Sequence, residues 1–169
     1  MTIWAAFFSD QYGARTKYLA MITKVAQALA SHPGVIGYDM INEPTGDEAT
    51  QIAPLHALAA AAIRSVDPSA IMFVSPAVLT SSGQQTMLPK PAFDNFAYAP
   101  HYYDPRVVIT GAWSGDQEGD AFGLMRGKAG EWGVPLFVGE FGAPPSSGQV
   151  GGYLDAIYQQ LDSSRRRRS

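Results

Sequence analysis

Apolar positions along the chain follow two different spacings. Tyr18, Ile22 and Val25 recur every three or four residues, which predicts an amphipathic helix, and His32-Pro33-Gly34 supplies the residues that end one. Short continuous apolar runs predict buried strands instead. The helical spacing predicts helices over residues 18–29, 54–66, 122–132 and 150–161. The apolar runs predict strands over residues 35–41, 70–74, 96–103 and 135–138.

Helices and strands therefore alternate, and the strands are apolar on both faces. This combination is typical of a parallel sheet built from βα units. The fold class expected is α/β, with about four parallel βα units. Polar residues cluster where each predicted strand ends. Parallel βα folds place their active sites at that edge, because loops and helix N-termini converge there.

The composition fits one domain with one core. The chain has 169 residues, of which 46% are hydrophobic, and it contains no internal repeat or linker. We expect residues 1–162 to form a single domain. Residues 163–169, SSRRRRS, offer no apolar side chain to a core, and we expect them to be a disordered basic tail.

The charge and the residue content of the chain restrict the classes of partner and cofactor that it could bind. The formal net charge is −3, and four of the 12 basic residues lie in Arg165–Arg168, so the body is more acidic than the total suggests. An acidic body repels phosphate backbones, which argues against nucleic acid. No apolar run is long enough to span a membrane. The start lacks the basic region of a signal peptide, which leaves the compartment open. Cysteine is absent, no metal-ligand spacing or phosphate loop is visible, and we expect no metal or cofactor.

Two carboxylates occupy ends of apolar strands. Glu43 and Glu140 lie about a hundred residues apart in the sequence, yet both follow predicted strands. Either one alone could cap a helix or pair with an arginine. Glycoside hydrolysis requires such a pair on either side of the scissile bond, with one carboxyl protonating the leaving oxygen. The pair therefore suggests a glycosidase.

Neighbouring residues strengthen that interpretation. Asn42 directly precedes Glu43, and its amide can donate to a sugar hydroxyl. His101 and Tyr103 lie at the end of a third predicted strand, where alternate residues share a face. Their imidazole and phenol can bond the two carboxylates. Trp113 follows in the next loop, where it could stack on a sugar or simply pack on the rim.

Three motifs in this order resemble glycoside hydrolase family five, a retaining family on the (β/α)8 barrel. They are Gly37-Tyr38-Asp39-Met40-Ile41-Asn42-Glu43-Pro44, His101-Tyr102-Tyr103 and Val138-Gly139-Glu140-Phe141-Gly142. Within the family, Ile36-Gly37-Tyr38-Asp39 and Gly139-Glu140-Phe141-Gly142-Ala143 are most similar to the endoglycoceramidase branch. The resemblance implies that the chain covers roughly strands four to seven, as a half-barrel.

The resemblance also assigns roles. It implies Glu43 as acid/base, Glu140 as nucleophile, Asn42 as a ligand of the sugar 2-hydroxyl, and His101 and Tyr103 as residues that orient the carboxylates. The expected substrate is a β-linked carbohydrate or glycolipid. A β-glucanase or β-mannanase is the alternative among enzymes. A catalytically silent carbohydrate-binding remnant is the alternative outside them, because nothing in the chain matches the family's strand-two Arg, strand-three His or strand-eight Trp. Relatives are usually secreted.

A half-barrel exposes apolar surface. Four strands with helices on one side would leave an open inner face and two unpaired edges, at residues 35–41 and 135–138. Such surfaces promote association. We therefore expect a homodimer or higher homo-oligomer that completes the barrel. The alternative is that the N-terminal segment folds over the open face of a monomer.

Overall fold

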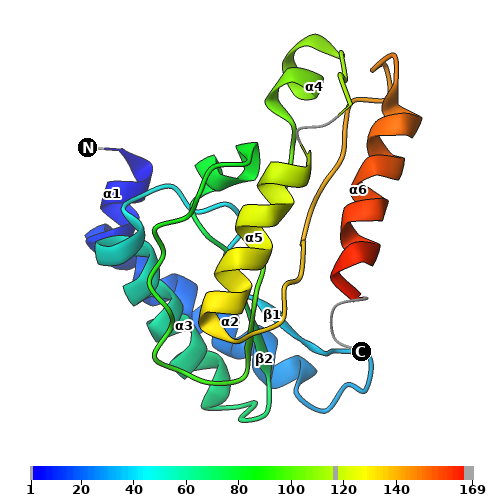
Figure 1. Cartoon of the computed structure of the whole chain (residues 1–169). Helices are drawn as coiled ribbons and strands as arrows, with labels where there is room; N and C mark the ends of the chain where they lie inside the picture. Colours follow the sequence, from blue (N-terminus) through cyan, green and yellow to red (C-terminus); the bar gives the residue numbers. More distant parts are fainter. Residues whose placement is uncertain (1, 116–117, 166–169) are drawn as a thin grey trace.

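The computed structural model describes residues 2–115 and 118–165 of the chain (Figure 1). Strands and helices alternate over most of this length, as expected. The strands are β1 (Gly37–Asp39), β2 (Ile71–Val74) and β3 (Phe96–Tyr98). The helices are α1 (Ile3–Phe8), η1 (Gln11–Gly13), α2 (Ala14–Leu29), η2 (Glu48–Ile52), α3 (Ala53–Arg64), η3 (Val78–Ser82), α4 (Pro105–Thr110), α5 (Glu118–Trp132) and α6 (Val150–Arg165).

The strands form one parallel sheet in the order β1-β2-β3. Asp39, Phe73 and Ala97 are in register across it, so their side chains share one face. The first two strands approach closely at Gly37, where a Cβ atom would overlap the carbonyl oxygen of Ile71. Glycine at this position therefore allows β1 to pair.

The expected fourth strand is present only as an extended segment beside β3. It makes two isolated parallel bridges, Tyr98 with Leu136 and Tyr102 with Phe141. Backbone hydrogen bonds join the same pair of segments, including one from Tyr102 N to the Glu140 carbonyl at 2.9 Å. The ladder thus has three strands among the described residues, and the segment at residues 135–141 continues it without forming a regular fourth.

The core lies between the sheet and its helices. Met72 and Val74 are fully buried, as are Ile63 on α3 and Phe122 on α5. Figure 1 shows α5 and α6 running side by side, with the segment that joins them lying along both helices. Each buried side chain of this size contributes about 1.5–3 kcal/mol to folding, so this layer holds the strands that carry the site.

The opposite face of the sheet is apolar and open. Ile71 and Phe73 are partly exposed there, and Phe73 contacts Phe137 with ring centroids 4.6 Å apart. Phe137 itself is 46% exposed. Together with Ile36 these residues line a groove of ≈ 540 Å³. The architecture is a segment of a (β/α) barrel with its inner face uncovered, and the homo-oligomer expected to cover that face stays a prediction.

The short helices were not predicted, and α1 and α4 are the two short α-helices among them. α1 packs on α2 through an edge-to-face contact of Phe7 with Tyr18, at 5.5 Å between centroids. α4 is capped by Asp104, whose Oδ1 accepts from the backbone N–H groups of Arg106 and Val107, and Pro105 is its first residue.

The ends of the chain differ in part from expectation. α6 continues to Arg165, past the expected domain end at residue 162. The rest of the expected tail, residues 166–169, lies outside the described residues. Within the described part of the chain, no helix is both long and apolar enough to cross a membrane.

Candidate active site

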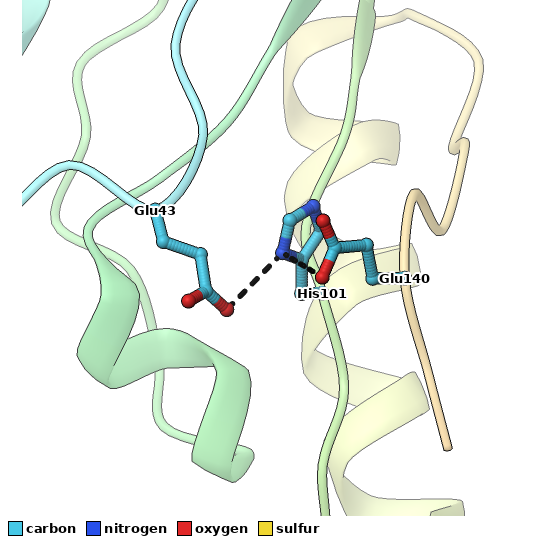
Figure 2. Close-up of side chains that lie close together, drawn as sticks. All are labelled: Glu43, His101 and Glu140. Atoms are coloured by element: carbon cyan, nitrogen blue, oxygen red, sulfur yellow. Dashed lines mark hydrogen bonds and ion pairs between the residues drawn. The ribbon is translucent and has the colours of Figure 1, made fainter.

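Three side chains from separate βα connections converge at one edge of the sheet. Glu43 follows β1, His101 follows β3, and Glu140 follows the extended segment at residues 135–138. Figure 2 shows the imidazole of His101 between the two carboxylates. The convergence follows from parallel strands, whose C-terminal ends meet at the same edge.

Hydrogen bonds and ion pairs link the three groups. His101 Nδ1 lies 3.2 Å from Glu43 Oε1 and 3.6 Å from Glu140 Oε2. The His101 side chain is 4% exposed, whereas those of Glu43 and Glu140 are 31% and 43% exposed. The histidine is therefore fixed by packing, and the carboxylates remain accessible to a ligand.

Glu43 has an unusual backbone. Its φ is +45°, in the left-handed region that costs a non-glycine residue about 1–3 kcal/mol. Pro44 follows and is buried, and proline restricts the residue before it. Backbone strain of this kind clusters at functional sites, so it adds to the case for Glu43.

Tyr103 holds the other carboxylate. Its hydroxyl donates to Glu140 Oε2 at 3.0 Å. Burial raises the pKa of Tyr103, and the hydrogen bond to Glu140 raises it further, because an ionised phenol could not donate. Tyr103 N also donates to the Ser81 carbonyl at 2.7 Å. The phenol is therefore a fixed donor to Glu140.

Asp39 places a third carboxylate near His101. The Ser75 hydroxyl donates to Asp39 Oδ1 at 3.3 Å. Partial burial raises the pKa of Asp39, and the nearby His101 opposes that shift. The site therefore carries more negative than positive charge.

A further carboxylate organises the loop after β2. Glu48 is only 9% exposed, and it accepts hydrogen bonds from Ala77 N at 2.9 Å, Thr86 Oγ1 at 2.8 Å and Met87 N at 2.5 Å. Ala77 belongs to the loop that lines a small pocket beside Glu43 and His101. Sequence reasoning missed this role, because an acidic residue near a helix start has the pattern of an ordinary N-terminal turn.

Two predicted site residues, Asn42 and Trp113, have other surroundings than the cluster around His101. Asn42 is exposed beside Glu43. Trp113 donates from Nε1 to the buried Glu118 at 2.5 Å and lies close against Gly152, where a Cβ would meet its ring. The structure thus brings together Glu43, His101, Tyr103 and Glu140, and it packs Trp113 against α6. Sugar binding by Asn42 and Trp113 stays a prediction.

Comparisons with known structures agree with this architecture. A crystal structure of endogalactoceramidase is similar with a TM-score of 0.81 and 24% identity, over 94% of this chain and 37% of that one. The lactosyl-enzyme intermediate of endo-glycoceramidase II from Rhodococcus sp. has a TM-score of 0.76 and 23% identity, over 93% and 40%. Cellulose synthase subunit Z from Clostridioides difficile has a TM-score of 0.73 and 20% identity, over 87% and 56%. The chain thus spans about two fifths of the length of the endogalactoceramidase and of the endo-glycoceramidase II.

Sequence comparison identifies the family. No curated protein matches the chain. The family model described as cellulase, glycosyl hydrolase family 5, matches residues 2–167. That match covers nearly the whole chain and all three strand-end motifs, and the structural neighbours share its barrel fold. The resemblance seen in the sequence is confirmed, and the chain belongs to glycoside hydrolase family 5.

Proposed function

We propose that this chain hydrolyses β-glycosides with retention of configuration, using Glu43 as acid/base and Glu140 as nucleophile. The observation that carries the proposal is the spacing of the carboxylates. One carboxylate oxygen each of Glu43 and Glu140 and one ring nitrogen of His101 all lie within 4.8 Å of one another. Retaining glycosidases hold their carboxyl groups about 5–5.5 Å apart, whereas inverting enzymes need about 6.5–9.5 Å to admit a water. The closer spacing favours direct attack by a carboxylate.

In the first step, a Glu140 oxygen attacks the anomeric carbon as the bond to the leaving oxygen breaks. Oε2 of Glu140 accepts from Tyr103, which leaves Oε1 available as the attacking atom. The proton on Glu43 passes to the leaving oxygen. The sugar is then esterified to Glu140, and Glu43 is ionised.

In the second step, Glu43 takes a proton from water, whose oxygen attacks the anomeric carbon. The ester bond breaks, and Glu140 returns as a carboxylate held by Tyr103. In the glycosyl-enzyme that precedes this step, Glu43 is ionised and can accept a hydrogen bond from His101 Nδ1, 3.2 Å away. Two inversions give net retention. Among the similar structures, that of the Rhodococcus endo-glycoceramidase II is of a lactosyl-enzyme intermediate, which is the type of covalent species proposed for Glu140.

The proposed substrate is a β-linked glucoside or galactoside, of which a glycolipid is one candidate. The support is the likeness to an endogalactoceramidase and an endo-glycoceramidase. Asn42, exposed beside Glu43, is the proposed donor to the sugar 2-hydroxyl. A β-glucan or β-mannan is the alternative substrate within the same chemistry.

The test is hydrolysis of an aryl β-glucoside and an aryl β-galactoside. Glu43→Gln and Glu140→Gln should each lower kcat/KM by about 10²- to 10⁴-fold, and Glu131→Gln, on the exposed side of α5, should leave it unchanged. A 2-fluoro sugar should label Glu140 covalently, which mass spectrometry of peptides would locate. Undiminished turnover in either glutamine variant, or labelling elsewhere, would refute the assignment.

The same preparation separates catalysis from binding alone. A carbohydrate-binding remnant would give a calorimetric binding signal with lactose or cellobiose but no release of the aryl group over days. That result would replace the proposed hydrolysis with sugar binding.

A further inference from the structure

The candidate active site has the donor set of a transition-metal ligand group. His101 offers an imidazole nitrogen, and Glu43 and Glu140 each offer a carboxylate oxygen (Figure 2). The sequence showed no such group, because its three members are separated by dozens of residues. Imidazole and carboxylate are ordinary ligands of zinc.

The distances suit a tetrahedral ion. Zinc binds nitrogen and oxygen at about 2.0–2.2 Å, so two ligand atoms of a tetrahedral site lie about 3.4 Å apart. His101 Nδ1 lies 3.2 Å from Glu43 Oε1 and 3.6 Å from Glu140 Oε2, on either side of that value. The third distance, between the carboxylate oxygens of Glu43 and Glu140, is at most 4.8 Å. Rotation of these two partly exposed side chains can shorten it.

The charge of the site favours a cation. In the part of the chain that the structure describes, the ion pairs of Glu43 and Glu140 are made with His101 and with no lysine or arginine. Asp39 adds another carboxylate near His101. A divalent ion would offset the two facing carboxylates more fully than one imidazole can.

The surroundings also support binding. His101 is buried and fixed, which lowers the entropy lost on coordination, and Tyr103 already donates to Glu140 Oε2. Such a donor orients a ligating carboxylate from outside the coordination shell. A fourth position would face the accessible side of the carboxylates, where the substrate is proposed to bind.

We propose that Glu43, His101 and Glu140 bind Zn²⁺ and that the bound ion excludes the glycoside from the site. The ion is thus an inhibitor, since it occupies both proposed catalytic carboxylates. Only the inhibition rests on the proposed function. Mg²⁺ should not bind, because it requires near-octahedral oxygen coordination.

Calorimetry of the chelator-treated full chain with ZnCl₂ tests the binding. We expect one saturable site, with affinity at least about 10- to 100-fold weaker in His101→Asn and in Glu140→Gln, because loss of a ligand costs no less than loss of an outer-shell partner. His32→Asn is the matched control, because His32 is exposed and outside the site, and it should bind zinc like the parent. MgCl₂ should give no signal. The chain has no cysteine, so thiol sites cannot contribute.

Circular dichroism and urea unfolding show whether each variant is folded, and Glu140→Gln changes a side chain that is 43% exposed, so it should fold even if His101→Asn does not. Absence of saturable zinc binding, equal affinity in Glu140→Gln, or loss of binding in His32→Asn would overturn the proposal.

Kinetics test the inhibition separately. Zinc should raise the apparent KM for an aryl β-glycoside and leave kcat unchanged. Zinc that binds at this site without raising KM would overturn the exclusion of substrate. If the chain hydrolyses no glycoside, the proposed function fails, while calorimetric competition between zinc and lactose still tests exclusion.

Discussion

Replacing His56 by leucine should make the protein less sensitive to acid. His56 lies on α3 and is 1% exposed, and neither ring nitrogen has a hydrogen-bond partner of normal geometry. Burial lowers the pKa of His56 from 6.5 to about 4, which the backbone of Ser75 offsets only in part. The folded protein therefore holds this imidazole neutral in an apolar layer.

Proton linkage gives the sign and the size of the change in the free energy of unfolding with pH. The unfolded chain takes up the proton near pH 6.5, while the folded chain resists it until about pH 4, so stability is complete above pH 6.5 and is lost as pH falls toward 4. At 1.36 kcal/mol per pKa unit, the full loss is about 3 kcal/mol. Between about pH 7 and pH 5 the same linkage gives about 2 kcal/mol.

Urea unfolding followed by circular dichroism measures the effect. The fall in free energy of unfolding from about pH 7 to pH 5 should be about 2 kcal/mol smaller in His56→Leu than in the parent. At pH 7 the variant should be at least as stable, because it removes a buried imidazole whose ring nitrogens lack hydrogen bonds of normal geometry. His32→Gln should keep the parental pH dependence. If His56→Leu loses as much stability as the parent, the buried neutral histidine is not a source of acid sensitivity.

Three further predictions concern the loop after β2, the candidate active site and the open face of the sheet. Glu48→Gln should cost about 2–3 kcal/mol in urea unfolding, because it weakens three hydrogen bonds to a buried carboxylate; a loss no greater than in exposed Glu131→Gln would contradict this. Gly139→Ala should lower kcat about tenfold, because the new Cβ would lie 3.1 Å from His101 Nε2 and displace the ring; full activity would show that the ring need not stay in place. Light scattering should show a homodimer or higher oligomer that Phe137→Lys weakens, and a monodisperse monomer near 18.1 kDa would refute association through the open face.

Local sequence patterns determined much of the architecture. The alternation of helical spacing and apolar runs predicted α2, α3, α5 and α6 and all three strands of the sheet, because each element carries its own period. Parallel strands align their C-terminal ends, so the order of elements also implied that Glu43, His101 and Glu140 share one edge. The structure places both carboxylates against the imidazole of His101.

Only the tertiary structure decided the rest. α1 and α4 are six residues each, too short to show a helical period, and their positions depend on packing and a cap. The segment expected as a fourth strand pairs only at isolated bridges. Glu48 reaches Met87 across 39 positions of sequence, and no local pattern encodes which distant backbone groups a buried carboxylate will satisfy. The spacing of the carboxylates around His101, on which both proposals depend, likewise arises from how separate loops pack, because periodicity sets the face of a residue but not its distance from another element.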